Sequence, residues 1–303
     1  MINRKWMILV ILLFLFIPLT AITAEDDKSW DIAVLSGDEL TGRFNQPASL
    51  FFNEEKRRLY VADTGNNRLV SFGSDLNYLA EFNADGRLEF PVGLVNDSKG
   101  RFFVVEGLKR KVVLIDIKTK SIKEIDFSGV PRGKGVYPDM LAIDSKDNLY
   151  VIDKANRCIL VFDAALRYKK RITVKGDFTG FADIKVDRKG NIYALDTLRG
   201  IVYIFNKKGK IIHKFGRRGT GKGEFDFPTS IAIDQRGLIY VVDQHKDKIL
   251  VFNRKGEFLF DFSQKGWKEG RLRYPSYIFI DRSNRIYVVD RGNNRIQIFK
   301  EKE

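Results

Sequence analysis

Short apolar runs separated by polar turns occur at regular intervals along the chain. The most constant run combines aliphatic and aromatic residues and ends in an acidic residue. It occurs six times, at Leu59–Asp63, Phe102–Glu106, Leu149–Asp153, Ile192–Asp196, Ile239–Asp243 and Ile286–Asp290. The six acidic residues follow one another at spacings of 43, 47, 43, 47 and 47 residues. Self-similarity at a period of about 40 to 50 residues indicates a repeat architecture.

Each repeat predicts four short strands. In the fifth repeat, apolar strands are expected at 228–234, 239–243, 249–252 and 257–262, with polar turns between them. Short β-rich runs joined by Gly-, Asn- or Asp-containing turns are typical of antiparallel hairpins. Four strands at this period are typical of a propeller blade, so six copies predict an all-β, six-bladed β-propeller with four-stranded antiparallel blades.

The two ends of the repeat region complement each other. The sixth repeat stops at Ile298–Phe299 without a fourth strand, while residues 30–37 precede the first repeat and resemble such a strand. We expect this N-terminal strand to complete the last blade and to close the ring, which removes an exposed sheet edge. An open solenoid would instead need atypical capping repeats. Residues 25–303 are therefore expected to form one domain.

The loops on either side of the acidic strands carry a further motif. Gly42–Pro47 is followed by Asp63–Leu69, and Gly270–Pro275 is followed by Asp290–Ile296. These segments resemble NHL repeats, whose pattern is Gly-x-Phe-x-x-Pro, then aliphatic-Tyr-Val-x-Asp, then an Asn-Arg-aliphatic corner. The resemblance covers essentially the whole chain beyond residue 24 and implies a six-bladed β-propeller. The second, fourth and fifth repeats depart from the pattern, for example through Glu106 in place of Asp.

The corner residues of these repeats are expected to be structural. Asp and Asn favour tight turns and bond to nearby backbone groups, while Arg68, Arg157 and Arg295 can pair with a carboxylate. We expect these residues to brace corners between blades. The single cysteine, Cys158, falls where other repeats have Leu or Ile, so it is expected to be a buried small apolar residue.

The N-terminal segment differs from the repeats. Arg4 and Lys5 precede an uncharged run over residues 6–24, which ends in small residues before the acidic Glu25. This arrangement is typical of a secretory signal peptide over residues 1–24. An uncleaved membrane anchor is the alternative, because the run approaches the length of a short bilayer-spanning helix. In both cases the propeller is expected outside the cytoplasm, in the periplasm or the extracellular space.

Positive charge dominates the composition, with a formal net charge of +14, or +12 without Arg4 and Lys5. In up-and-down blades, the loops after the second strands share one face with the loops that lead into each blade, and loops commonly carry function. Basic and aromatic residues are interleaved there, which suits an anionic partner. The expected partner-binding residues are Lys109, Arg110, Lys154, Arg199, His245, Trp267, Tyr274 and Arg291. The alternative is charge spread over both faces for solubility, since the opposite turns are also basic at 188–189, 207–208 and 254–255.

Two carboxylates are expected near the mouth of the central channel. Asp139 and Asp183 are interpreted as occupying equivalent places at the start of the innermost strands. Other repeats have Ser49, Gly93, Ser230 and Tyr277 close to that place. Two such carboxylates could share a divalent cation or raise one another's pKa. The alternative is that they cap turns or pair with arginine.

The chain contains few residues that could carry out catalysis. Some NHL propellers are similar to peptidyl-α-hydroxyglycine amidating lyases, which hold zinc through histidines from several blades. Only His213 and His245 are present here, and they are expected in an outer strand and a loop. A catalytic zinc normally takes three protein ligands, so we predict no catalytic residue, no metal ligand and no cofactor, apart from the cation that the channel could hold.

These observations favour a non-catalytic binding or scaffold module of the cell envelope, with a protein or polyanionic partner. One alternative is a metal-assisted lyase or hydrolase that works in the channel. A second alternative is RNA binding, as in some intracellular NHL propellers, although an exported protein rarely meets RNA. Fold analogy alone does not decide among them.

Overall fold

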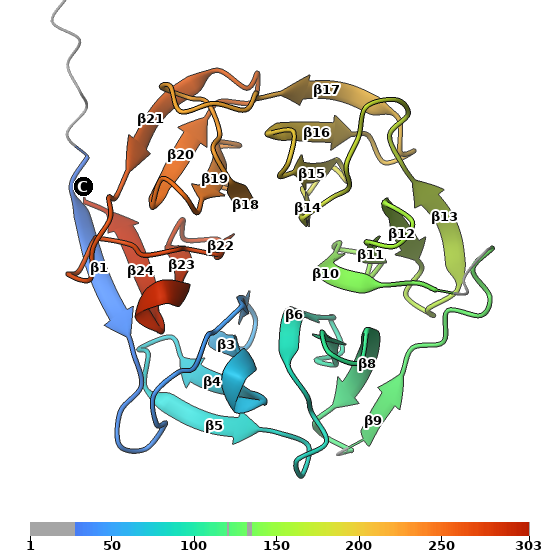
Figure 1. Ribbon diagram of the computed structural model, residues 1–303. Coiled ribbons are helices and arrows are strands. Elements are labelled where there is room, and N and C mark those ends of the chain that lie inside the picture. Colours follow the sequence, from blue (N-terminus) through green and yellow to red (C-terminus); the bar gives the residue numbers. More distant parts are fainter. Residues whose placement is uncertain (1–27, 120, 132–134, 303) are drawn as a thin grey trace, which may run out of the picture.

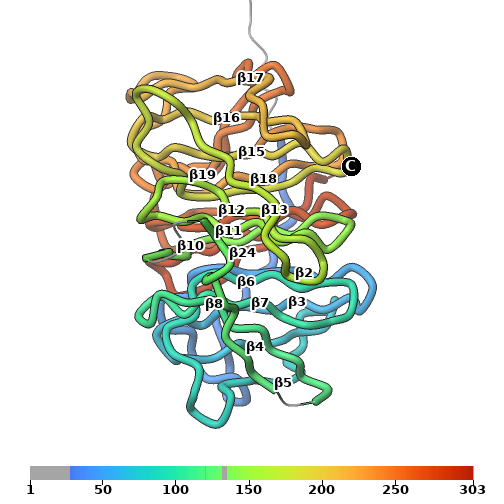
Figure 2. Tube along the Cα trace, turned by 90° about the vertical axis from the view of Figure 1, so that its right-hand side faces the viewer, coloured from blue at the N-terminus to red at the C-terminus, as the bar shows by residue number. Residues whose placement is uncertain are grey.

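Twenty-four strands form six four-stranded antiparallel sheets around a central axis in the computed structural model, which describes residues 28–119, 121–131 and 135–302 (Figure 1). The six-bladed β-propeller expected from the repeats is confirmed. Figure 2 shows the ring from its side, with strands that run between its two faces. The signal or anchor predicted over residues 1–24 lies outside the described residues. No helix in the described part of the chain has the length and apolar character needed to cross a membrane.

The strands of the blades have the following bounds. Blade 1 contains β2 (Ser49–Asn53), β3 (Arg58–Asp63), β4 (Arg68–Gly73) and β5 (Tyr78–Phe82). Blade 2 contains β6 (Pro91–Asn96), β7 (Phe102–Glu106), β8 (Lys111–Asp116) and β9 (Ser121–Glu124). Blade 3 contains β10 (Pro138–Ile143), β11 (Leu149–Asp153), β12 (Cys158–Phe162) and β13 (Tyr168–Ile172). Blade 4 contains β14 (Asp183–Val186), β15 (Ile192–Asp196), β16 (Ile201–Phe205) and β17 (Ile211–Phe215). Blade 5 contains β18 (Pro228–Ile233), β19 (Ile239–Asp243), β20 (Lys248–Phe252) and β21 (Phe258–Phe262). Blade 6 contains β22 (Tyr277–Ile280), β23 (Ile286–Asp290), β24 (Arg295–Glu301) and β1 (Trp30–Leu35). Short 3-10 turns follow the second strands of blades 1 and 6, at η1 (Thr64–Asn66) and η2 (Arg291–Asn293).

Blade 6 is assembled from both ends of the described chain. β1 pairs antiparallel with β24, in a register that runs from Trp30 opposite Glu301 to Leu35 opposite Ile296. The predicted closure of the ring by an N-terminal strand is therefore confirmed. The pairing covers an edge that would otherwise be open on β24.

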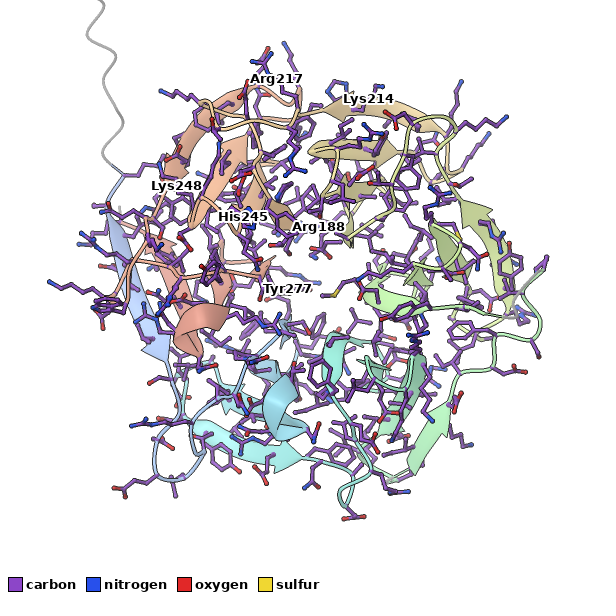
Figure 3. All side chains as sticks on the ribbon, viewed as in Figure 1. Arg188, Lys214, Arg217, His245, Lys248 and Tyr277 are labelled. Atoms are coloured by element: carbon purple, nitrogen blue, oxygen red, sulfur yellow. The ribbon has the colours of Figure 1, made fainter. Side chains whose placement is uncertain are left out.

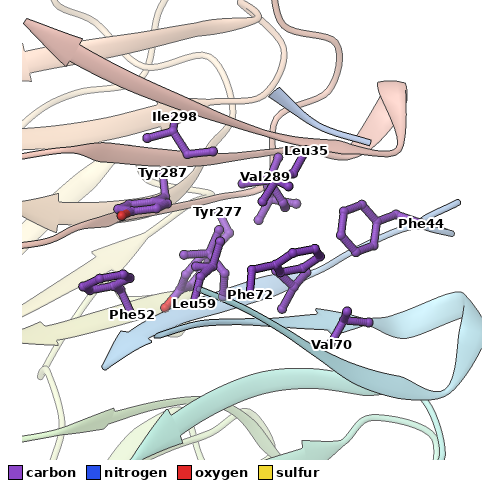
Figure 4. Packing of buried hydrophobic residues seen from close by; sticks show 13 residues of the cluster. Leu35, Phe44, Phe52, Leu59, Val70, Phe72, Tyr277, Tyr287, Val289 and Ile298 are labelled. Atoms are coloured by element: carbon purple, nitrogen blue, oxygen red, sulfur yellow. The ribbon is translucent and has the colours of Figure 1, made fainter. Parts of the chain in front are cut away.

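The core lies between neighbouring blades, because the inner strands of each blade are covered on both faces. Between blades 6 and 1, Phe44, Phe72 and Val289 pack together with Tyr287, whose ring stacks on Phe52 at 5.7 Å (Figure 4). Burial of each such side chain contributes about 1.5–3 kcal/mol relative to exposure. Cys158 is fully buried in the cluster between blades 2 and 3, as expected. Its position was misjudged, because it pairs with Asp153 and so corresponds to Arg68 and Arg295, not to a Leu or Ile.

The acidic residue of every repeat holds the loop that leads into its own blade. All six side chains are buried, and each accepts a backbone N–H from a residue 16 to 18 positions earlier. The pairs are Asn45 with Asp63, Glu89 with Glu106, Tyr137 with Asp153, Thr179 with Asp196, Phe227 with Asp243, and Arg273 with Asp290. The expected bonding of these acids to backbone groups is confirmed, although the acids connect parts of one blade. The expected bracing between blades comes from the corner residues Asn67 and Asn294, which accept the N–H of Phe90 and of Gln46 in the next blade.

The arginines of the corners divide into two groups. Arg68 pairs with Asp63 at 2.8 Å, and Arg295 pairs with Asp290 at 2.6 Å. Arg157 instead donates to the carbonyl of Phe178 at 3.3 Å. The corner of blade 3 is as long as those of blades 1 and 6, but Cys158 stands at the position of Arg68 and Arg295. Arg157 lies one position earlier, and the expected pairing does not form.

Candidate functional site

The ring has two faces with different connections. We call the face with the loops after the second strands, together with the connections between blades, the loop face. The turn face carries the turns that join the first strand of each blade to the second, and the third to the fourth. The central channel runs between these two faces.

The residues predicted to bind a partner lie on the loop face, but most of their charges are already paired. Lys109 lies 2.8 Å from Glu89 and 3.4 Å from Glu106, and the hydrogen bond to Glu89 is the main reason that its pKa is raised. Lys154 lies 2.9 Å from Asp139. Arg199 pairs with Asp177.

The other predicted residues of the loop face make weaker or neutral contacts. Arg110 covers the ring of Tyr137 at 4.7 Å. His245 stacks on Phe227 at 4.6 Å and lies 3.6 Å from Asp226. Arg291 donates to the side chain of Gln46.

Trp267 and Tyr274 are the aromatic residues most open to solvent on this face, at 75% and 49% exposure. Together, the eight predicted residues come from five blades. They share a face but do not form one compact cluster.

Asp139 and Asp183 do not occupy equivalent places, so that interpretation was wrong. Asp183 pairs with Leu195, the residue before the repeat acid, and Ser230 pairs in the same way with Val242. In blade 3 the corresponding residue is Met140, because Leu141 pairs with Val151. Blade 4 lacks the proline that opens the inner strands of the neighbouring blades, and without it the sequence does not define this register.

Asp139 is a largely buried carboxylate on the loop-face side of the channel. Its side chain is 20% exposed and lies 2.9 Å from Lys154. Burial raises its pKa, Lys154 opposes this rise, and the charge of Asp183 adds to it. The charge of Asp183 therefore raises the pKa of Asp139, as the sequence suggested. The alternative pairing with arginine is not found for these two residues: Asp139 pairs with Lys154 and Asp183 with Lys185.

Asp183 anchors a hydrogen-bond network that joins three blades. Its buried carboxylate accepts from Lys185 Nζ at 2.7 Å, from Ser230 Oγ at 2.5 Å and from the N–H of Ile231 at 3.0 Å. Ser230 Oγ in turn accepts the N–H of Ile278 at 3.2 Å. Blades 4, 5 and 6 are therefore connected next to the channel axis by buried polar groups, each of which has its partner.

Lys185 extends across the channel toward Tyr277 of blade 6. Its ammonium lies 4.6 Å from the centre of the Tyr277 ring, a cation–π distance. Burial alone would lower the pKa of Lys185, but the charge of Asp183 and the contact with Tyr277 outweigh it, and the pKa is raised. Lys185 is thus a permanent cation whose charge is neutralised by Asp183. Figure 3 shows Tyr277 and Arg188 toward the centre of the ring, whereas Lys214 and Arg217 lie at its periphery.

A pocket of about 440 Å³ occupies the turn-face half of the channel, and we call it the channel pocket. Each blade contributes to its lining the inner-strand residue that pairs with the aromatic residue of the second strand. These six residues are Phe51, Val95, Ala142, Lys185, Ala232 and Phe279. The two phenylalanines lie side by side on blades 1 and 6, with ring centres 5.7 Å apart. The alanines lie on either side of Lys185, so the space in the pocket is next to small side chains and opposite an aromatic wall.

The rim of the channel pocket carries positive charge without paired acids. Arg188, Lys189 and Arg254 line it, and none of them forms an ion pair with a carboxylate in the described residues. The acids beside them are engaged: Asp187 accepts from the turn that it opens, and Asp234 pairs with Arg236 at 2.8 Å. Sequence reasoning noted these basic turns only as spread charge. Small residues at the inner-strand position of Ala142 and Ala232 were the available signal for a pocket, and it was missed.

The two histidines lie in different kinds of element. His213 is on the outer strand β17 and contacts the carbonyl of Lys255 at 2.9 Å, whereas His245 is in a loop of blade 5. Within residues 28–119, 121–131 and 135–302, no group of three or more His, Cys, Asp or Glu side chains is arranged to hold a metal ion.

Comparisons with known proteins support the fold. Residues 177–259 and 236–300 each match a protein family described as a 6-bladed beta-propeller, and together they span less than half of the chain. No protein of curated function matches the sequence. Among solved structures, virginiamycin B lyase from Staphylococcus aureus is similar with a TM-score of 0.64 and 12% identity, over 90% of this chain and 100% of that chain. A gluconolactonase from Xanthomonas campestris has a TM-score of 0.66 and 14% identity, over 90% of each chain. An auxiliary nutrient binding protein from Bacteroides thetaiotaomicron has a TM-score of 0.69 and 12% identity, over 91% of this chain and 78% of that chain. At these identities the likeness concerns the fold alone.

Proposed function

We propose that this protein is a non-catalytic binding propeller that holds a small organic ligand in the channel pocket. One observation carries the proposal: each of the six blades contributes at least one inner-strand residue to a cavity of about 440 Å³. Cavities of about 300–1,000 Å³ with mainly apolar walls and a few polar groups are typical of ligand sites. The lining has this character, with phenylalanine, valine and alanine around Lys185.

The chemistry of the channel supports binding over catalysis. Asp183 has no free lone pair directed into the pocket, because its oxygens accept from Lys185, Ser230 and the backbone. Lys185 stays protonated and is paired, so it is neither a base nor a nucleophile. The fold neighbours include lyases, a gluconolactonase and a binding protein, and a shared fold does not choose among these activities.

The setting proposed from the sequence is retained. We propose that the propeller works outside the cytoplasm, after export directed by residues 1–24. The NHL grouping is retained as well: in blades 1 and 6 the Asp, Asn and Arg of the motif meet in one hydrogen-bonded corner, with Asn66 and Arg68 on Asp63.

The test uses a neutral fluorescent probe, N-phenyl-1-naphthylamine, which brightens in apolar sites. We expect saturable binding of one probe per chain, lost in Ala142→Trp and in Ala232→Trp because the indole fills the cavity. Leu198→Trp, at an exposed loop-face position, is the control and should bind as the unmodified protein does. Where a tryptophan variant does not fold, Ala142→Met takes its place. Equal binding by folded pocket-filling variants and the control would contradict the proposal.

A further inference from the structure

The channel pocket differs from a simple apolar cavity in where its positive charge is available. Two positions offer cations: Lys185 at the deep end and the rim at the turn face. Lys185 lies 2.7 Å from Asp183, so its charge is already compensated. The rim cations Arg188, Lys189 and Arg254 have no paired carboxylate among the described residues, and they outnumber Asp187, a rim carboxylate held by backbone and amide donors. A ligand anion therefore finds uncompensated charge only at the rim.

Arg254 is held in place at the rim by the adjoining turn. Its Nη2 donates to the carbonyl of Arg236 at 3.0 Å. Gly237 has a positive φ of 84°, and any Cβ at that position would collide with the guanidinium of Arg254. The absence of a side chain at Gly237 allows Arg254 to lie across the turn. An arginine fixed by its surroundings loses less entropy when it binds an anion.

The opposite wall of the pocket suits a flat apolar body. Phe51 and Phe279 are only partly buried and meet edge to face. Their exposed surface borders the pocket, while Ala142 and Ala232 leave the space next to them unfilled. Aromatic side chains prefer offset-stacked or edge-on contact with another ring. The volume of about 440 Å³ far exceeds that of an inorganic ion and its few waters, since one water takes roughly 30 Å³ of liquid.

We infer that the ligand of the channel pocket is an amphipathic organic anion with a planar apolar body. The body lies against Phe51 and Phe279, and the anionic group lies at the rim with Arg188 and Arg254. This inference rests on the proposed function, because it names the ligand class of the same pocket. It also fixes the orientation, with the charge toward the turn face and the apolar end toward Tyr277.

The experiment compares two probes that share one ring system. 1-Anilinonaphthalene-8-sulfonate carries a sulfonate, and N-phenyl-1-naphthylamine lacks it. We expect the sulfonate probe to bind the full mature chain about tenfold more tightly at low salt. We expect this preference to fall as salt is added, because ions screen the rim charges. The double variant Arg188→Gln with Arg254→Gln should lose the preference, while its affinity for the neutral probe stays unchanged.

A matched control separates the rim from the general charge of the face. Lys207→Gln with Lys255→Gln removes the same charge from turns of the same face, and neither residue lines the pocket. This control should retain the preference for the sulfonate probe. Phe279→Leu should weaken both probes, because both use the aromatic wall.

The possible outcomes test the ligand class and the binding function separately. If the neutral probe binds in the pocket but the sulfonate gives no gain, or if both charge variants reduce the gain equally, the inferred ligand class is wrong and the binding function stands. If neither probe binds the folded chain, the binding function itself fails. If the sulfonate probe binds equally well to the Ala142→Trp variant, it sits outside the pocket and the inference is overturned.

Discussion

Three cations of the loop face and the cations at the rim of the channel pocket differ in whether they are paired with a carboxylate. On the loop face, Lys109, Lys154 and Arg199 are each paired with at least one carboxylate. On the turn face, Arg188 and Arg254 surround the channel pocket without such partners among the described residues. Pairing distinguishes these two groups of cations but not the faces as wholes, since Arg110 and Arg291 of the loop face form no ion pair in the described residues, whereas Arg236 and Arg285 of the turn face do. Charge available to a ligand is therefore a property of local geometry and not of composition.

Two acidic residues, one on each face, also act over different distances along the chain. On the loop face, Asp290 accepts from the backbone of Arg273, 17 residues earlier, and from Arg295. On the turn face, Asp187 accepts from Lys189 and Asn191, within its own turn. Asp290 thus holds a long connection in place, and Asp187 closes only its own hairpin. Other turn-face acids reach farther, as Asp147 accepts from Ser98 of the neighbouring blade.

The largest effect is expected from Asp290→Ala. Arg295 has a side chain that is 10% exposed, and it would be left buried without its carboxylate. Loss of one partner of a buried pair costs about 3–5 kcal/mol. Urea or guanidinium denaturation should show this loss in the free energy of unfolding, and Asp290→Asn should lose less because it keeps an acceptor. A loss below about 1 kcal/mol would contradict the structural role of this acid.

A smaller effect is expected from Asp187→Ala on the opposite face. Its contacts are local, and the donors that it releases can reach water. A net cost of about 0.5–1.5 kcal/mol is expected from the lost hydrogen bonds. The same denaturation measurement gives the comparison. If Asp187→Ala destabilises as much as Asp290→Ala, the distinction between long and local braces does not hold.

A pH-dependent effect is expected at Asp139. Burial raises its pKa above the ordinary value of 3.8. A carboxyl with a raised pKa in the folded protein favours folding when protonated, and this contribution is lost as the pH rises through the raised pKa. Asp139→Asn should therefore gain stability relative to the unmodified protein as the pH rises above 3.8. The difference in unfolding free energy, measured across this range, should increase with pH, and a constant difference would argue against the raised pKa.

The smallest effect on stability is expected from Arg188→Gln. Its side chain is exposed and makes no ion pair in the described residues, so the free energy of unfolding should change by no more than about 0.5 kcal/mol. Thermal unfolding provides the measurement. A larger loss would mean that this cation holds the fold together, and that its role in ligand preference could not be separated from stability.

The sequence was sufficient for the blades, the closure of the ring and the structural character of the repeat acids, but not for the loop that each acid holds. These features depend on local chemistry that recurs at a fixed period, such as the strand that ends at Asp243 and its five counterparts. The ion pairs of the loop face could not be predicted from the sequence in the same way. Lys109 meets Glu89, 20 residues earlier, only because the hairpin of β6 and β7 returns the chain to the same face.

The channel pocket could not be predicted from periodicity, because it depends on departures from it. Ala142 and Ala232 occupy positions where Phe51 and Phe279 stand in other blades, and only the closed ring brings all four together. The register of blade 4 was also ambiguous without its proline. Periodicity defines the scaffold, and the irregular positions define the site.

The pairing of β1 with β24 sets an order of events for the growing polypeptide. Lys302 donates its backbone N–H to Ser29, so groups 273 residues apart in the sequence lie side by side. During synthesis, the first strand leaves the ribosome long before its partner exists. Blades 1 to 5 can form as their residues appear, but the sixth must wait for residue 301. The ring therefore closes only when β1 and β24 are both present, and truncation before β24 would leave five whole blades and an unpaired first strand.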